Sequence, residues 1–267
     1  MIVQIATPML ELWRIDGEFS NHPHAHDAEY QITVPVRGDC QFTLENKQYL
    51  LHDGAALVQH PGERHFFEAR TLSGLIIFKI RREGMGGSHP GSEAEWAVKQ
   101  QFDPMQLMQY FRIWTDTLMR SDPYDRLIQE QTESQVIEYV TSVMTGTGSL
   151  SLSHPSSLAA ATHKDVHLRQ VLDYIHSHYR EELSVDMLAG IAAQSRYHFI
   201  RYFKSATGET PYQYVLKLRM KEAMHRLRTS HASVIDIALS LGYSSASPFY
   251  RAFAKTYGVH PEQCRGK

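Results

Sequence analysis

The sequence predicts a multidomain α+β protein, in which an N-terminal barrel of short strands and a helical hairpin precede an all-α domain with two helix-turn-helix motifs. Length is the first observation, since 267 residues are about twice the usual size of a single domain. The second is a regular series of short strands in the first hundred residues. The third is an internal repeat near the C-terminus, at an offset of 50 residues.

The composition is that of a globular protein. Hydrophobic residues make up 42% and charged residues 21% of the chain, which is too apolar for a disordered protein. No segment approaches the roughly 18 consecutive apolar residues of a membrane helix, and the N-terminal segment lacks the basic residues that begin a secretion signal. Cys40 and Cys264 lie far apart and form no metal-type or redox pair. These features predict a cytoplasmic protein with reduced thiols and no membrane partner.

Charge is divided unevenly along the chain. Residues 166–267 contain 14 Lys and Arg against 8 Asp and Glu, a net charge of +6, whereas residues 1–165 contain 13 against 21, a net charge of −8. Such asymmetry indicates that the C-terminal part meets a polyanion and the N-terminal part does not. The same numbers also fit two surfaces of unrelated charge, so charge alone leaves the partner open.

Residues 1–100 are predicted to form a sandwich or barrel. Their short runs are rich in β-branched or aromatic residues, and turn formers such as Arg37-Gly38-Asp39 and Pro61-Gly62 separate them. Short strands with regular turn signals are typical of both architectures. The predicted strands are YQITVPV (30–36), CQFTLEN (40–46), QYLL (48–51), AALVQH (55–60) and LIIFKI (75–80).

Residues 101–145 are predicted to form a helical hairpin. Apolar residues recur at helical spacing over 105–118 and again over 127–143, and Asp122-Pro123 separates the two series. The hairpin either packs on the barrel or provides the seam of a dimer. We expect a homodimer through this hairpin, because each helix keeps an apolar stripe.

The segment after the hairpin is predicted to be a linker. Residues 146–165 are small, polar and broken by Gly and Pro, which is typical of a flexible connection between domains. The chain that follows, residues 166–267, has the punctuated helical pattern of a separate C-terminal domain.

The internal repeat lies in this C-terminal domain. It pairs FIRYFKSATGETP (199–211) with FYRAFAKTYGVHP (249–261), and each copy indicates a helix, a tight turn and a second helix. Two phenylalanines stand four residues apart in each copy and should face the core. Arg201 and Arg251, which occupy the same place in the two copies, should then face outwards.

The outward faces of the two helices suit DNA recognition. A helix-turn-helix inserts a short helix into the major groove, where Arg binds guanine in a bidentate way and small apolar groups meet the thymine methyl. Single arginines on helices are usually only solvated, but the same outward Arg in both copies favours base recognition. The side chains predicted to face outwards are Arg196, Tyr197, Ile200 and Arg201 in the first copy, and Ala246, Ser247, Tyr250 and Arg251 in the second.

Residues 166–267 resemble the DNA-binding domain of the AraC/XylS family of bacterial transcription regulators, through LSVDMLAGIAAQSRYHFIRYFKSATGETPYQYVLKLRMKEAMHRL and SVIDIALSLGYSSASPFYRAFAKTYGVHPEQCR. The resemblance implies two helix-turn-helix units joined by a long helix near Pro211–Arg228. It places Tyr197, Ile200 and Arg201, and then Ala246, Ser247, Tyr250 and Arg251, toward the bases. It makes Lys204, Arg219, Lys255 and Arg265 candidates for phosphate or structural contacts. Cys264 departs from the family, which usually has Tyr before the final Arg.

Three histidines carry a second resemblance. HPHAHDAEYQ (22–31) places His24 and His26 two residues apart, on one face of a strand, and His65 ends GAALVQHPGERH (54–65). Residues 10–80 are similar in this respect to cupin barrels, whose metal pattern is HxH, a carboxylate and a His on a second hairpin. The resemblance implies a cupin-like effector-binding barrel over residues 1–100, which regulators of this family often carry.

The carboxylate departs from the cupin pattern. Its expected position falls on Tyr30 or Gln31, whereas Glu29 comes one residue early and should face away from the two histidines unless a bulge turns it. Three neutral imidazoles can still hold Zn²⁺ or another divalent metal, and they can equally line a pocket for an organic ligand. His24, His26 and His65 are therefore candidates for both effector and metal binding, and Tyr30, on the same strand face, for effector binding.

These features together predict a sequence-specific transcription regulator, not an enzyme, whose small-molecule effector binds in the barrel. By analogy with the family it is predicted to be an activator, with double-stranded DNA, the effector, a second copy of itself and RNA polymerase as partners. One alternative is a metal-dependent cupin enzyme fused to a DNA-binding domain, against which the missing in-register carboxylate argues. Another is an architectural DNA binder without an effector.

Overall fold

The protein folds into two compact units. The computed structural model describes residues 1–85, 96–146 and 161–265, with the backbone alone given for 161–165. The first unit contains residues 1–115 and 135–150, and the second contains 116–134 and 151–267. The two helices of the predicted hairpin, α2 (Pro104–Arg120) and α3 (Arg126–Met144), therefore each begin in one unit and end in the other.

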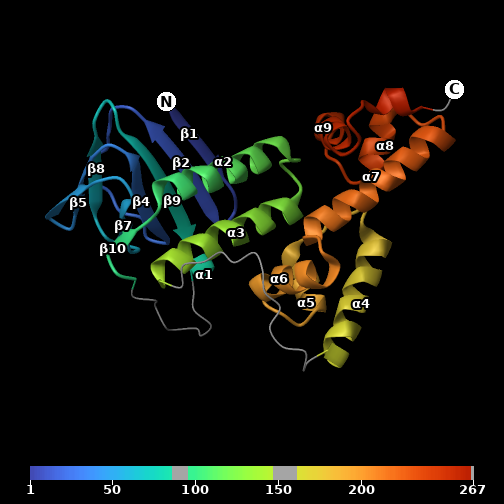
Figure 1. Cartoon of the computed structure of the whole chain (residues 1–267), viewed down its shortest axis with the longest axis horizontal. Helices are drawn as coiled ribbons and strands as arrows, with labels where there is room; N and C mark the ends of the chain where they lie inside the picture. Colours follow the sequence, from blue (N-terminus) through green and yellow to red (C-terminus); the bar gives the residue numbers. More distant parts are fainter. Residues whose placement is uncertain (86–95, 147–160, 266–267) are drawn as a thin grey trace. The chain divides into compact units, whose positions relative to one another are not determined.

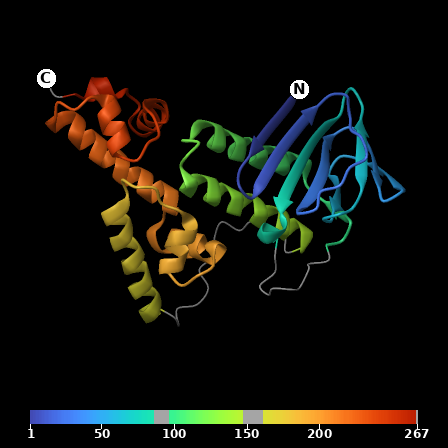
Figure 2. The ribbon, with the colours of Figure 1, turned by 180° about the vertical axis from the view of Figure 1, so that it is seen from behind.

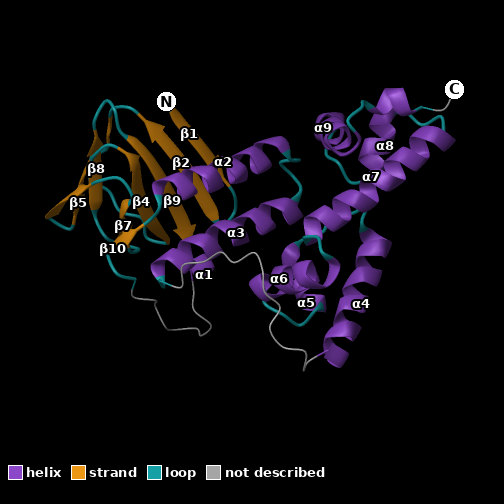
Figure 3. Ribbon diagram, viewed as in Figure 1, coloured by secondary structure: helices purple, strands orange, loops and turns teal. Residues whose placement is uncertain are grey.

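The first unit is built on two antiparallel sheets (Figure 1, Figure 3). The six-stranded sheet has the order β1-β2-β9-β4-β7-β10 and the four-stranded sheet the order β3-β8-β5-β6. The strands are β1 (Ile2–Ala6), β2 (Leu10–Asp16), β3 (Phe19–Ser20), β4 (Glu29–Arg37), β5 (Cys40–Leu44), β6 (Lys47–Leu51), β7 (Ala55–Gln59), β8 (His65–Ala69), β9 (Gly74–Arg81) and β10 (Lys99–Gln101). All five predicted strands are present.

Strand register decides which side chains meet between the sheets. Thr33 on β4 lies opposite Leu57 of β7 and Ile77 of β9, and both of these pack with Phe42 of the other sheet. The next residue, Ile32, points to the opposite face. Residues 31 and 33 of β4 therefore face the space between the sheets.

Helices α2 and α3 cover the outer face of the six-stranded sheet in both views (Figure 1, Figure 2). Phe78 of β9 has its ring centroid 6.5 Å from that of Phe102 and 6.4 Å from that of Trp114 on α2. Tyr139 on α3 closes this aromatic cluster, at 6.0 Å from Phe102. A short helix, α1 (Arg82–Met85), follows β9.

The second unit holds two helix-turn-helix motifs. The first consists of α5 (Val185–Ile191) and α6 (Arg196–Thr207), and the second of α8 (Val234–Ser240) and α9 (Ala246–Tyr257). The long helix α7 (Pro211–Thr229) joins them, as the sequence predicts. Helix α4 (Ala161–His178) precedes the first motif, and a 3-10 helix, η2 (Pro261–Cys264), follows the second.

The predicted punctuation residues set the ends of these helices. Ser184 caps α5 by accepting a hydrogen bond from the Met187 amide, and Ser233 forms a capping box with Asp236 at α8. Gly208 and Gly258 end α6 and α9 with φ of 80° and 72°. This left-handed conformation is easy for glycine and unfavourable for residues that have a Cβ atom. The duplicated sequence therefore gives duplicated local structure.

Only part of the linker predicted over 146–165 falls within the described residues. Residues 147–160 lie outside the described residues, and 161–165 form the first turns of α4, so the prediction of a linker is wrong for those five. The other predicted domain limits stay predictions. Within the described residues, no helix is long and apolar enough to cross a membrane.

Candidate effector site and DNA interface

His24, His26 and His65 come together in the first unit. Each offers a ligand atom that lies within 4.8 Å of those of the other two. Their ring centroids are 4.9 Å apart for His24–His26, 4.4 Å for His24–His65 and 5.4 Å for His26–His65. The grouping of these three histidines is as the sequence predicts. No carboxylate belongs to this group, the one cluster of metal-ligand type among the described residues.

Backbone pairing holds the three histidines in place. His24 forms an isolated bridge with His65, the first residue of β8: the His24 amide donates to the His65 carbonyl at 3.0 Å, and the His65 amide donates to the His24 carbonyl at 2.8 Å. The Gly62 amide donates to the His26 carbonyl at 2.8 Å. Segment 22–28 is thus fixed against the turn before β8, although it is not a continuous strand.

Hydrogen bonds set the tautomer of two of the rings. The Nδ1 of His24 lies 2.8 Å from the His22 carbonyl oxygen, and that of His65 lies 3.1 Å from the Glu63 carbonyl oxygen. Because a carbonyl oxygen only accepts, each Nδ1 carries the proton and each Nε2 keeps a free lone pair. The Nε2 atoms of His26 and His65 are buried and have no hydrogen-bond partner.

Burial favours the neutral form of His26 and His65. It lowers the pKa of His65 to about 4, and the positive charge of Lys79 and the other two histidines act in the same direction. The pKa of His26 is also lowered, mainly by burial and then by Lys79. Neutral imidazoles with free Nε2 lone pairs can accept hydrogen bonds from a ligand or bind a metal ion.

Tyr30 does not share a face with these histidines, so that prediction is wrong. It lies opposite Ile80, whose side chain packs near Ile137 of α3, and its ring contacts His60 at a centroid distance of 5.4 Å. The reason is local, since residues 25–28 are not strand and the two-residue period does not run from His26 into β4. Tyr30 therefore belongs to the face of the sheet that packs on the helices.

Of the two residues at which the cupin carboxylate was expected, Tyr30 and Gln31, it is Gln31 that lies beside the histidines. It is 2% exposed, donates from Nε2 to Thr33 Oγ1 at 3.2 Å and is a hydrogen-bond partner of His26. Gln59 lies opposite it on β7, also buried, with its Oε1 atom unpartnered. Where cupins carry a carboxylate, this chain carries a neutral amide.

Lys79 and Trp13 are further residues near this group that sequence reasoning missed. Lys79 lies opposite Gln31 on β9, has its Nζ 5.3 Å from the Trp13 ring centroid and lies 3.9 Å from a carboxylate oxygen of Glu11. Only the β4–β9 register reveals that this lysine faces the space between the sheets.

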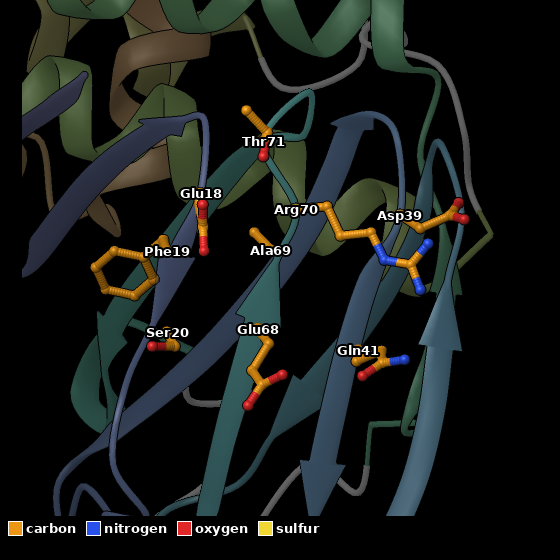
Figure 4. A pocket seen from close by; sticks show the side chains of 9 residues that line it. All are labelled: Glu18, Phe19, Ser20, Asp39, Gln41, Glu68, Ala69, Arg70 and Thr71. Atoms are coloured by element: carbon orange, nitrogen blue, oxygen red, sulfur yellow. The ribbon is translucent and has the colours of Figure 1, made fainter.

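A separate surface pocket of about 460 Å³ lies on the outer face of the four-stranded sheet (Figure 4). Gln41, Glu68 and Arg70 line it from β5, β8 and the residue after β8, with Glu18 and Asp39 at its edge. None of the predicted effector residues is among its lining residues.

The core of each recognition helix is as the sequence predicts. Phe199 and Phe203 of α6 and Phe249 and Phe253 of α9 are fully buried. Arg201 and Arg251 are exposed at matching positions on α6 and α9. The other candidates differ in exposure: Ser247 and Lys255 are exposed, whereas Tyr197, Ile200, Lys204, Ala246 and Tyr250 are half-buried. Ile200 packs partly on the core of the first motif.

Several basic candidates already have partners within the second unit. Arg196 bonds the carboxylate of Asp186 and, at 3.3 Å, that of Glu133. Arg251 donates from Nε to the Arg120 carbonyl at 2.9 Å. Arg219 is 4% exposed and donates to the carbonyls of Tyr179 and Glu181, so of its two predicted roles it has the structural one. The guanidinium of Arg265 likewise bonds the Ala232 carbonyl.

Two family models match the chain. The AraC-like ligand binding domain matches residues 12–83, which contain the three histidines. A helix-turn-helix domain matches residues 188–267, which contain both recognition helices.

Known proteins with similar sequences are transcription regulators rather than enzymes. The chain is 30% identical over 262 residues to the HTH-type transcriptional activator RhaS of Enterobacter sp. (strain 638), a match that covers 91% of this chain and 87% of that protein. It is 34% identical over 98 residues to the MmsAB operon regulatory protein of Pseudomonas aeruginosa, covering 35% of this chain and 32% of that one. A solved structure, the DNA-binding domain of AdpA in complex with a target DNA, is 32% identical and covers 36% of this chain and 86% of that chain, with a TM-score of 0.35.

Proposed function

Because this chain belongs to the AraC family of transcription regulators, we propose that it activates transcription in response to a small molecule bound between the sheets of its first unit. A helix-turn-helix DNA-binding domain and a ligand-binding domain are both present. The relatives named as activators support the direction of regulation, which implies a contact with RNA polymerase. Such a regulator works beside the chromosome, in the bacterial cytoplasm.

One observation carries the location of the effector site. The Nε2 atoms of His26 and His65 and the Oε1 atom of Gln59 are buried without partners, and a buried polar atom that makes no hydrogen bond costs about 1–3 kcal/mol. A ligand with hydrogen-bond donors would satisfy all three. Lys79 adds one positive charge beside them, which favours a ligand that carries a negative charge or a partial one.

A divalent metal is a second occupant that the same atoms favour. Three imidazoles in one group fit the nitrogen donors of Zn²⁺ and similar ions. The carbonyl bonds to Nδ1 orient the rings of His24 and His65 and leave their Nε2 lone pairs free. A bound ion would offer the effector an open coordination position. Gln31 would stand beside it as a neutral group, without the carboxylate of the cupin pattern.

Replacing both His24 and His65 with Ala is expected to abolish binding at this site. We expect the wild-type chain, freed of metal and titrated with Co²⁺, to develop the absorption bands of bound cobalt if it holds a metal, and the double variant to develop none. DNA binding should be unchanged in the variant, since the second unit contains neither residue.

His22→Ala is the matched control, because His22 lies in the same segment, is exposed and offers only its backbone carbonyl to the group. Cobalt bands of equal strength in the double variant would exclude these three ligands. Their absence from the wild-type chain as well would exclude the metal and leave the hydrogen-bonded organic ligand.

The homodimer is proposed to form through α2. Helix α3 buries its apolar stripe within the chain, including Leu127, Val136 and Val140, so it is not available as predicted. Helix α2 exposes Met105, Ile113 and Met119 on the side away from its buried residues. The proposed dimer interface therefore involves α2 alone and not both helices of the hairpin.

Ile113→Glu is expected to shift the full chain from dimer to monomer, because it places a charge in the centre of that apolar stripe. Sedimentation at tens of micromolar detects association stronger than roughly −6 kcal/mol. Leu72→Glu, at a 79% exposed position of the strand-connecting loops, should leave the dimer intact. A wild-type chain that sediments as a monomer would contradict the proposal.

A further inference from the structure

The end of the helical hairpin buries polar side chains instead of apolar ones. Residues 116–134, here called the hairpin end, belong to the second unit. In α3, the five consecutive residues from Glu130 to Ser134 are polar, and each is at most 6% exposed. Buried charges require partners, because an unpaired carboxylate in the interior costs several kcal/mol.

The partners of these carboxylates are in the first helix-turn-helix and the long helix. Glu130 accepts from the amides of Val185 and Asp186 at the start of α5, at 2.6 and 3.3 Å. Glu133, 1% exposed, accepts from Arg196 at the start of α6. Gln131 likewise accepts from the Tyr212 amide at the start of α7, at 3.3 Å.

The loop of the hairpin makes the equivalent contacts with the second helix-turn-helix. Asp122, 6% exposed, accepts from the amide and the hydroxyl of Ser244, at 2.7 and 2.6 Å, just before α9. The Arg120 carbonyl accepts from Arg251 on α9 at 2.9 Å. The hairpin end therefore contacts both motifs, and at each it contacts the start or the outer face of the recognition helix.

We propose that the hairpin end is an internal lock that competes with DNA for the recognition helices. The proposal rests on the proposed function, because it takes Arg196 and Arg251 as DNA-contacting residues. In the locked arrangement Glu133 holds Arg196, the Arg120 carbonyl holds Arg251 and Asp122 holds the chain before α9.

The competition follows from the chemistry of the contacts. DNA presents phosphate oxygens to arginines and to the amides at helix starts, and base acceptors to arginines in the groove. The hairpin end presents carboxylate and carbonyl oxygens to the same kinds of donors. An Arg251 that donates Nε to Arg120 is not free to form the planar bidentate bond with a guanine, so this contact must break before the groove is read.

Helices α2 and α3 connect the lock to the ligand-binding unit. Residues 104–115 of α2 and 135–144 of α3 belong to the first unit, and the same helices continue into the hairpin end. Small shifts of a packed helix are passed along its length, which is a known route of switching. A ligand that favours one position of these helices would thereby favour or release the lock.

The test measures DNA affinity of the full chain with the lock weakened. Asp122→Asn combined with Glu133→Gln removes two carboxylates while keeping shape and hydrogen-bonding capacity. The DNA is a site selected from random sequences with the wild-type chain, and binding is followed by fluorescence anisotropy without effector. The double variant is expected to bind this site ~5- to 150-fold more tightly, the usual range of an allosteric coupling.

The control removes two negative charges elsewhere, because any such loss raises affinity for a polyanion. Asp53→Asn combined with Glu68→Gln makes the same change in net charge at two exposed residues of the first unit, outside the hairpin end. It should gain far less affinity than the lock variant. Equal gains in the two variants, or a loss of affinity in the lock variant, would overturn the proposal, the latter by making the hairpin end a support for DNA binding.

A second variant keeps the proposal testable if the first does not fold. Asp122→Cys with Ser244→Cys, in a chain with Cys264→Ser, allows a disulfide to close the lock where the two side chains already touch. The oxidised form is expected to bind DNA more weakly than the reduced form, and equal binding would refute the lock. If Arg201→Ala and Arg251→Ala leave DNA binding intact, the proposed function fails instead.

Discussion

Replacing Arg201 with Ala is expected to weaken binding to a selected DNA site by about 1–3 kcal/mol and to relax base preference at one position. Arg201 lies exposed on α6 above the buried Phe199 and Phe203, where a guanidinium can reach a guanine edge in the major groove. Arg251→Ala on α9 should act in the same way at a second position about one helical turn away, because α7 holds the two motifs apart.

Specificity and affinity must be measured together for these variants. Lys204→Ala on α6 is the comparison, since a lysine that neutralises a phosphate contributes equally at every sequence. It should weaken binding to all sites and reduce the salt dependence of the affinity, without a change in base preference. Selection from random DNA with each variant gives the preferences. If neither Arg201→Ala nor Arg251→Ala changes the selected sequence, α6 and α9 are not the reading helices.

Replacing Arg219 with Ala is expected to destabilise the second unit by about 3–5 kcal/mol, the usual effect of removing one partner from a buried pair. Arg219 is 4% exposed and donates to the Tyr179 carbonyl at 2.7 Å and to the Glu181 carbonyl at 2.9 Å. It also lies 3.2 Å from a carboxylate oxygen of Asp125, whose pKa is raised by burial. Its loss would leave the two carbonyls without this donor and the Asp125 carboxylate without its positive partner.

The distribution of tryptophans lets this loss be assigned to one unit. The chain contains three, Trp13, Trp96 and Trp114, and all three are in the first unit. In urea, tryptophan fluorescence therefore follows the first unit, whereas circular dichroism of helices mainly follows the second. Arg219→Ala should move the dichroism transition to lower urea more than the fluorescence transition. Lys221→Ala, an exposed neighbour on α7, should move neither, and an equal effect of both variants would contradict the structural role of Arg219.

Local sequence determined the helix-turn-helix domain almost completely. Its signals act within a few residues: serines at Ser184 and Ser233 cap helices, glycines at Gly208 and Gly258 end them, and phenylalanines four apart mark the buried face. Each of these effects depends on the backbone conformation of neighbouring residues. The helix limits, the long connecting helix and the outward positions of Arg201 and Arg251 could therefore be predicted.

The histidine group was predicted only in part, because its composition depends on contacts between strands that are distant in sequence. The HxH spacing and the turn before His65 suggested that three histidines meet, and they do. The choice between Tyr30 and Gln31 depended on whether residues 25–28 are strand, and their irregular backbone reversed the expected face. Lys79 and Gln59 joined the group only through pairing between strands that are distant in sequence.

The sequence by itself determined that this chain has a strand-rich N-terminal domain with an HxH motif and a duplicated helix-turn-helix domain that reads DNA. Only the tertiary structure shows that the polar residues 130–134 of α3 are buried. From the sequence, a helical segment of Glu, Gln, Thr and Ser would be expected to face solvent. The partners of these buried residues, Arg196 and the start of α5, are more than fifty residues away along the chain. No periodic pattern encodes a contact between polar groups so far apart, since only packing brings each carboxylate to its donor.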